Sequence, residues 1–253
     1  MKNRFYYPTF PYPGGKAKQA LDICSCAPNS GNVFADVFCG LGNVFWPAPS
    51  LLNYQHWWLN DIRTSEFFHA IARIGNTVTV PDRAATASFY CFYKSECRRL
   101  YGNSYSDEAE VLNPYLSRNG GGYFVVGART SGGGPGATGY ARSLREAHRI
   151  MSLVNPRVTD WDYEPVFECL GPTDFAFIDP PYLGASVGSY STSDLDHKRL
   201  IIWLKNAKFR WLLCEYRHPA YVRMFGEPFW TRNVHRFAHQ NGGRRTECMW
   251  KNY

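Results

Sequence analysis

The chain has 253 residues, of which 45% are hydrophobic and 19% charged, which indicates a folded globule and excludes a disordered chain. Its net charge is +7, and residues 198–253 hold 12 Lys and Arg against 3 Asp and Glu, which favours a polyanionic partner. The 8 cysteines show no zinc spacing and no apolar run approaches a membrane span, so we expect no metal, no membrane partner and a cytoplasmic location.

The amino-terminal part carries two glycine turns. Pro13-Gly14-Gly15-Lys16 is a flexible turn that delivers one lysine, although a solvated turn has the same composition. Further on, the apolar strand ending at Asp36 and Val37 runs into Gly40-Leu41-Gly42, where glycines allow close approach of the backbone. A helix is expected to start from Asn43. This turn lacks the third glycine of the dinucleotide-binding fingerprint.

A second strand is predicted to end in an acid. Trp57-Trp58-Leu59-Asn60-Asp61-Ile62 follows the glycine turn by about 20 residues, the spacing at which a carboxylate can accept both hydroxyls of a ribose. The pair of strand ends favours a nucleoside cofactor over a chance match.

The middle of the chain changes composition. Residues 66–100 are mostly helical in character, with a break at Pro81, whereas residues 101–140 are rich in Gly, Tyr, Ser and Asn. A short apolar run, 123–126, lies between two triple-glycine segments and predicts a hairpin strand with an arginine near each end. Such a hairpin suits a DNA groove, and a glycine-rich surface loop is the alternative. Residues 141–154 are expected to be helical.

The next motif is the most informative one. Phe175-Ala176-Phe177-Ile178 reads as a short buried strand, and Asp179-Pro180-Pro181-Tyr182 follows it directly. Two prolines cannot donate the backbone hydrogen bonds that join neighbouring strands, so the chain must leave the sheet here. This is the carboxyl end of the strand, where open α/β sheets bind their ligands. A carboxylate, a proline carbonyl and an aromatic face are the groups that hold a flat base with an amino group. Taken alone, the motif is equally consistent with a sharp structural exit.

Beyond this motif, the polar loop 183–192 has the composition of a lid. Residues 194–207 are expected to form a helix capped by Ser193 or Asp194, and residues 209–216 a buried strand.

Taken in order, the Gly-Gly-Lys turn, the Asp-x-Phe-x-Gly-x-Gly segment, Asn60-Asp61 and Asp-Pro-Pro-Tyr resemble the Dam-like (D12 class) S-adenosylmethionine-dependent DNA adenine N6-methyltransferases. Asp162-Tyr163 looks like the acid-aromatic pair of that family, Tyr190 like its second tyrosine, and the end of the chain from Arg244 to Tyr253 like its closing strand. The resemblance spans roughly residues 5–62 and 155–253. The middle departs from the family pattern, which leaves the recognition sequence open.

The resemblance implies an α/β fold: a Rossmann-like class I methyltransferase mixed sheet with helices on both faces, plus an inserted helical and hairpin target-recognition region. Residues 1–62 and 150–253 would form the catalytic domain, and residues 63–149 the insert.

It also implies roles for individual residues. The catalytic residues would be Asp179, Pro180, Pro181 and Tyr182. The S-adenosyl-L-methionine site would comprise Tyr12, Gly15, Lys16, Asp36, Phe38, Gly40, Gly42, Asn43, Asp61, Ile62, Asp162, Tyr163 and Asp179. The nucleic acid would contact Lys16, Arg118, Asn119, Arg129, Tyr190, Arg217 and Arg244.

The expected partner is double-stranded DNA, and the expected assembly is a monomer or a weak dimer. Three alternatives stay open at this point: cytosine-N4 methylation, RNA adenine methylation, and a catalytically silent DNA-binding module on the same fold.

Overall fold

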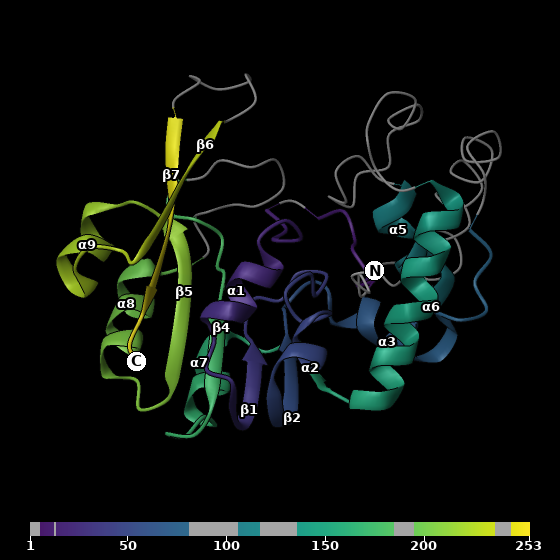
Figure 1. Ribbon diagram of the computed structural model, residues 1–253, viewed down its shortest axis with the longest axis horizontal. Helices are drawn as coiled ribbons and strands as arrows, with labels where there is room; N and C mark the ends of the chain where they lie inside the picture. The colour runs from purple at the N-terminus through teal and green to yellow at the C-terminus, as the bar shows by residue number, and fades with distance from the viewer. Residues whose placement is uncertain (1–5, 13, 81–105, 117–135, 185–194, 236–243) are drawn as a thin grey trace, which may run out of the picture.

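The computed structural model describes residues 6–12, 14–80, 106–116, 136–184, 195–235 and 244–253 (Figure 1). These residues form a seven-stranded sheet in the order β3-β2-β1-β4-β5-β7-β6. The strands are β1 (Ser30–Asp36), β2 (Asn53–Asn60), β3 (Arg157–Thr159), β4 (Phe175–Ile178), β5 (Arg210–Tyr216), β6 (Trp230–His235) and β7 (Arg244–Lys251). Strands β1 to β5 run parallel, and β7 pairs antiparallel with both β5 and β6. This mixed sheet, five parallel strands with an antiparallel pair at one edge, confirms the expected Rossmann-like α/β fold.

Helices cover both faces of the sheet (Figure 1), which explains why the central strand β4 is apolar throughout. In β4 all of the residues are buried, and neighbours alternate between two cores: Phe175 and Phe177 pack in one, Ala176 and Ile178 in the other. The second core is closed by α7 (Tyr163–Glu168), α8 (His197–Asn206) and α9 (Pro219–Phe225). On the first face lie α1 (Ala20–Cys26) and the short α2 (Ala48–Leu51).

A group of three helices lies beside the sheet, at the right of Figure 1: α3 (Ser65–Ile74), α5 (Asp107–Leu116) and α6 (Ala137–Val154). The guanidinium of Arg73 on α3 bonds both carboxylate oxygens of Asp107 at 2.6 and 2.7 Å, and the Tyr140 hydroxyl donates to the Val111 carbonyl at 2.7 Å. Their buried side chains belong to the same core as Phe34 of β1. The division of the chain at residues 63 and 149 stays a prediction, and the hairpin expected at 120–134 lies outside the described residues.

Two local expectations were wrong. No helix begins at Asn43: residues 41–47 form turns, and α2 starts at Ala48 after Pro47. Helix α8 begins at His197, and its amino-terminal cap is Asp196, which accepts from the amides of Lys198 and Arg199. Within the described ranges, no helix has the length and apolar character that crossing a bilayer requires.

Candidate active site

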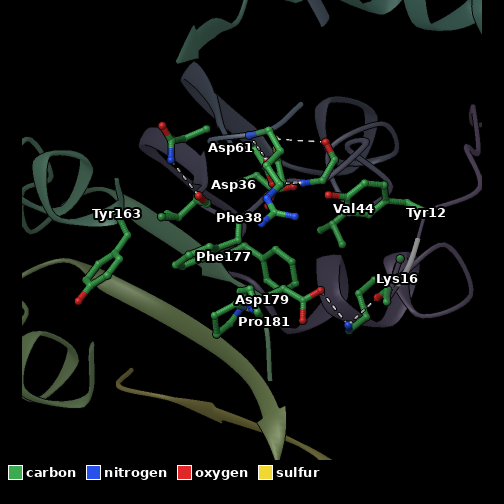
Figure 2. Close-up of a pocket in the computed structure, with 18 of the residues that line it drawn as sticks. Tyr12, Lys16, Asp36, Phe38, Val44, Asp61, Tyr163, Phe177, Asp179 and Pro181 are labelled. Atoms are coloured by element: carbon green, nitrogen blue, oxygen red, sulfur yellow. Dashed lines mark hydrogen bonds and ion pairs between the residues drawn. The ribbon is translucent and has the colours of Figure 1, made fainter. Parts of the chain in front are cut away.

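One cavity of about 250 Å³ opens at the carboxyl ends of the parallel strands, where the strand order reverses between β1 and β4 (Figure 2). That reversal is the usual ligand site of open α/β sheets. Most residues predicted for the cofactor and for catalysis line this one cavity: Tyr12, Gly15, Lys16, Asp36, Phe38, Gly40, Asn43, Asp61, Ile62, Asp162, Tyr163, Asp179, Pro180, Pro181 and Tyr182. Segments separated by more than 100 residues therefore converge on a single space.

The glycine turn is tied to the end of β2 by Asp61. One carboxylate oxygen of Asp61 accepts from the Gly40 amide at 3.0 Å, the other accepts from the Arg63 amide at 2.9 Å, and the Thr64 hydroxyl donates to the Gly40 carbonyl. Gly40 has a φ of +52°, and a Cβ there would lie 2.7 Å from the ring of Tyr12. Glycine is required at this position because a side chain would both strain the backbone and displace a wall of the cavity.

Asp36 is the least satisfied polar group of the cavity. Its side chain is 1% exposed, and neither carboxylate oxygen has a hydrogen-bond partner among the described residues. Burial raises its pKa well above the usual value, the charges of Asp179 and Asp61 raise it further, and Lys16 lowers it. A buried carboxylate of this kind fits a cationic ligand group, such as the α-ammonium of S-adenosylmethionine.

Lys16 and Asp179 form a buried ion pair. Lys16 Nζ lies 2.7 Å from Asp179 Oδ2 and 3.0 Å from the Gly14 carbonyl oxygen, which it also donates to. Burial raises the pKa of Asp179, whereas the charge and hydrogen bond of Lys16 lower it, and the effect of burial is the larger one. Burial lowers the pKa of Lys16, but the surrounding acids, Asp179 foremost, outweigh it and the pKa of Lys16 is raised. The pair places one positive charge at the Asp-Pro-Pro-Tyr turn and leaves Lys16 only 6% exposed.

The Asp-Pro-Pro-Tyr turn leaves the sheet at the end of β4, as predicted. The Tyr182 ring packs edge-on against Tyr216, with centroids 4.6 Å apart, and Lys16 Nζ lies 4.9 Å from its centroid. Tyr216 also lines the cavity, and the guanidinium of Arg245 lies 5.1 Å from its ring. Two aromatic rings and a cation thus surround the place where a flat base is expected.

The opposite end of the cavity is built around Asn60. Its amide oxygen accepts from the Thr159 hydroxyl and the Trp161 amide, and its nitrogen donates to the carbonyls of Val37 and Trp161. Asn60 thereby joins the ends of β1, β2 and β3. Next to it, the exposed Asp162 caps α7 by accepting from its neighbour's amide at 2.7 Å.

Tyr163, the residue after that cap, is buried and packs against Phe38, with ring centroids 5.9 Å apart. Figure 2 shows Phe38 beside Asp36 and Tyr163 farther along the same cavity. These two rings and Trp161 give this end of the cavity an aromatic lining.

Several predicted residues do not line the cavity. Gly42, with φ +70°, faces Phe68 and Trp46 in the core. Arg217 is exposed and bonds Glu227 at 2.6 and 2.9 Å. Arg244 is the first residue of β7, where its backbone pairs with that of His235. Arg118, Asn119, Arg129 and Tyr190 lie outside the described residues.

The lining residues that sequence reasoning missed include Asn60 as a bridging side chain, Trp161, Tyr216 and Glu247. Glu247 accepts from the Gln19 amide at 2.9 Å and stands opposite Tyr216 in the β5–β7 register. The one sequence feature that could have indicated Glu247 is its position in the predicted closing strand, three residues after Arg244. In the part of the chain that the structure describes, no group of three His, Cys, Asp or Glu side chains is placed to hold a metal ion.

One protein-family model matches part of the chain. The model described as D12 class N6 adenine-specific DNA methyltransferase matches residues 12–101. No curated protein sequence is significantly similar to the chain. Among solved structures, a candidate RNA methyltransferase from Pyrococcus horikoshii aligns with a TM-score of 0.41 and 12% identity over 96% of this chain and 85% of that one, a level that says nothing about substrate. The family match covers the Gly-Gly-Lys turn, the glycine turn and Asp61, and on that segment it confirms the resemblance of this chain to the Dam-like, D12 class adenine N6-methyltransferases.

Proposed function

We propose that the chain transfers a methyl group from S-adenosylmethionine to the N6 amino group of an adenine in double-stranded DNA, after the base has been flipped out of the helix. The observation that carries this proposal is that Gly40 and the Asp179–Tyr182 turn line the same cavity. A methyl donor over the glycine turn and a base at the catalytic turn would therefore face each other.

The residues of the cavity divide into two groups. Asp36, Asp61 and Asp162 line different parts of the cavity. Asp36 would pair with the ammonium group of the methyl donor, Asp61 would accept hydrogen bonds from its ribose hydroxyls, and Asp162 would accept one from its adenine amino group. When bound, S-adenosylmethionine supplies a methyl group on a positively charged sulfur. The residues around Asp179 would then hold the nucleophile.

The Asp179–Tyr182 turn would hold the target base. Asp179 and the Pro180 carbonyl would accept the two N6 hydrogens, which leaves the nitrogen lone pair free to attack, and Tyr182 would stack on the ring. The carboxylate also stabilises the positive charge that develops on N6, and the proton is released only after the new bond forms. We therefore assign Asp179 to orientation and electrostatic stabilisation before proton abstraction.

Double-stranded DNA is the proposed partner. A stacked adenine cannot reach a buried turn, so flipping is required, at a cost of a few kcal/mol. Residues 198–253 hold 12 Lys and Arg against 3 Asp and Glu, and the Arg245 guanidinium lies 5.1 Å from the ring of Tyr216, which lines the cavity. Both features support a polyanionic partner. Specific contacts are proposed for Arg118, Asn119, Arg129, Tyr190 and Arg244, whereas Arg217 would first have to leave Glu227.

The test is a product assay. The purified chain is incubated with S-adenosylmethionine and either duplex DNA or RNA, and the nucleosides are analysed by mass spectrometry. N6-methyladenine in the DNA is the expected product. N4-methylcytosine, methylation of the RNA alone, or cofactor binding without any product would each replace the proposal by one of the three alternatives. Mapping methylated bases in DNA from cells that express the chain then gives the recognition sequence.

A further inference from the structure

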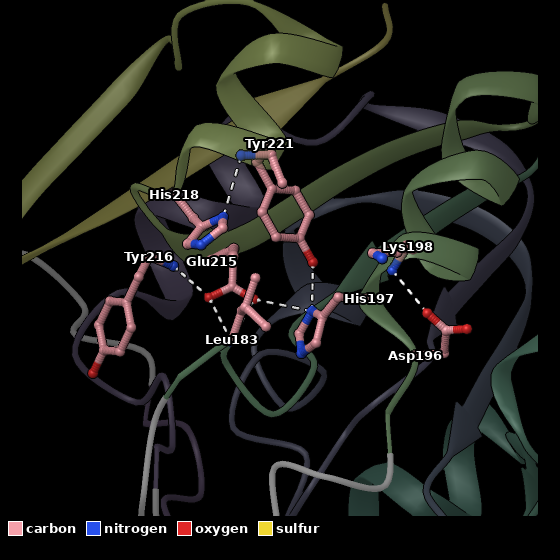
Figure 3. Close-up of polar contacts among 9 residues, drawn as sticks. Leu183, Asp196, His197, Lys198, Glu215, Tyr216, His218 and Tyr221 are labelled. Atoms are coloured by element: carbon pink, nitrogen blue, oxygen red, sulfur yellow. Dashed lines mark hydrogen bonds and ion pairs between the residues drawn. The ribbon is translucent and has the colours of Figure 1, made fainter.

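A fully buried carboxylate lies behind the catalytic turn. Glu215, at the carboxyl end of β5, is 0% exposed. Both of its oxygens lie within hydrogen-bond distance of the Leu183 amide, at 3.2 and 3.1 Å, and one of them accepts from the Tyr216 amide at 2.6 Å (Figure 3). Leu183 is the residue that directly follows Tyr182.

The Glu215 carboxylate also contacts the first residue of α8. One Glu215 oxygen lies 3.6 Å from His197 Nδ1, and that nitrogen lies 2.6 Å from the Tyr221 hydroxyl of α9. Figure 3 shows Glu215 between Leu183 on one side and His197 on the other. Glu215 therefore touches both flanks of the segment that connects the catalytic turn to α8.

The chemistry of these contacts requires an acceptor. The Leu183 and Tyr216 amides donate into the protein interior, and leaving a buried donor unpaired costs about 1–3 kcal/mol. A carboxylate satisfies both, but burying one carries a desolvation penalty of several kcal/mol that its partners only partly offset. An apolar residue would avoid that penalty but would leave the two amides unpaired. Glu215 therefore fixes two backbone amides in addition to filling the core.

The two last residues of β5 act on Tyr182 from two sides. Glu215 fixes the backbone that follows it, and the Tyr216 ring packs against it with centroids 4.6 Å apart. A shift of the Leu183 backbone would move the Tyr182 ring and, with it, the turn that carries Asp179. Residues expected at the methyl donor, Asp36 and Asp61, belong to β1 and the end of β2, and neither touches Glu215.

We propose that Glu215 is a positioning residue for the methyl transfer: by holding the Leu183 amide from behind, it sets Tyr182 and Asp179 in the geometry that captures the target base. The proposal rests on the proposed function and assigns the effect to the nucleic-acid side of the cavity. Glu215 itself touches neither the base nor the methyl donor.

The experiment compares Glu215→Gln with a matched control, Asp174→Asn. Asp174 is also a buried carboxylate that accepts two backbone amides, from Val33 at 2.9 Å and Gly171 at 2.7 Å, but it lies at the opposite end of β4. Three quantities are measured for each variant: hydrogen exchange of the Leu183 amide in the free chain, the dissociation constant of S-adenosylmethionine, and kcat and KM on DNA.

For Glu215→Gln we expect at least tenfold faster exchange at Leu183, at least tenfold lower kcat on DNA and less than twofold change in cofactor affinity. Asp174→Asn is expected to lower the melting temperature without changing kcat or the Leu183 exchange. Unchanged kcat in Glu215→Gln, or an equal loss of kcat in Asp174→Asn at equal stability, overturns the inference while the proposed function stands. If the wild-type chain methylates neither DNA nor RNA, the proposed function fails and the positioning role fails with it.

If Glu215→Gln does not fold, Glu215→Asp takes its place. It keeps the carboxyl group and withdraws it by one methylene, so an intermediate loss of kcat with intact cofactor binding supports positioning. Wild-type kcat in Glu215→Asp with fast exchange at Leu183 overturns it.

Discussion

Lys16 Nζ lies 2.7 Å from Asp179 Oδ2, so two residues 163 positions apart form one buried ion pair at the Asp-Pro-Pro-Tyr turn. The pair explains how a lysine from a glycine turn near the start of the chain belongs to the same site as a motif beyond its middle. The charge and hydrogen bond of Lys16 lower the pKa of Asp179, and the burial that raises this pKa acts in the opposite direction.

Replacing Asp179 by Asn should lower kcat for methylation by at least about 100-fold, the scale seen when one electrostatic stabiliser is removed from an active site. The amide keeps an oxygen acceptor but loses the charge that stabilises N6 as it becomes positive. Cofactor affinity and kcat are measured in parallel with Asp22→Asn, an exposed aspartate on α1. Normal turnover by Asp179→Asn would remove Asp179 from the mechanism.

Gly40→Ala should weaken cofactor binding, because the new Cβ would lie 2.7 Å from the Tyr12 ring that lines the cavity. Gly226→Ala is the matched control: Gly226 also has a positive φ, +79°, but a Cβ there meets nothing within 4 Å. Both variants are expected to lose about 1 kcal/mol of stability through backbone strain. Only Gly40→Ala is expected to raise the calorimetric dissociation constant, and equal affinities in the two variants would contradict a cofactor site at this turn.

Asp36→Asn should stabilise the free chain and weaken its cofactor binding. Burial raises the pKa of Asp36, so the ionised carboxylate opposes folding until a cation meets it. An amide relieves that penalty but cannot pair with an ammonium. We expect a higher melting temperature without ligand and at least tenfold weaker binding, which is about 1.4 kcal/mol. A variant that binds S-adenosylmethionine as tightly as the wild type would show that Asp36 does not meet the ammonium.

Tyr182→Ala should reduce capture of the target base by about 1–3 kcal/mol of stacking, whereas Tyr182→Phe keeps the ring and should retain most of the activity. The loss is measured in single-turnover kinetics on DNA, and flipping is followed by the fluorescence of 2-aminopurine at the target position. The Tyr216 ring, 4.6 Å away, would lose its edge-on partner in the alanine variant. Equal rates for the two variants would argue against a stacking role.

Much of the site was predictable because parallel strands end at one edge. In the sequence, the end of each of β1, β2 and β4 is marked by an apolar run followed by an acidic residue. The carboxyl ends of adjacent parallel strands lie at the same edge of the sheet, so these acidic residues must lie close together. Strand β4 was predicted with its observed bounds, since its four buried residues are followed directly by Asp179 and two prolines.

What could not be predicted depends on non-local register. Glu247 reaches the cavity because β7 pairs antiparallel with β5 and sets it opposite Tyr216, a register that no local pattern contains. Asn60 bridges the ends of β1 and β3, and its sequence neighbours give no sign of it. The cap of α8 was misplaced because Ser193, Asp194 and Asp196 are all suitable residues, and only the geometry selects the one that reaches two amides.

The free chain should become less stable as the pH rises toward 8. Burial raises the pKa of Glu215 from 4.5 to about 8, so the folded chain binds this proton more tightly than the unfolded chain does. The contribution is therefore fully present below pH 4.5 and is lost as the pH rises through 8, at no more than about 1.4 kcal/mol per pH unit for one proton. Glu215→Gln should flatten this slope between pH 5 and 8 in chemical unfolding. An identical slope in Glu215→Gln and the wild type would mean that Glu215 is already ionised throughout this range.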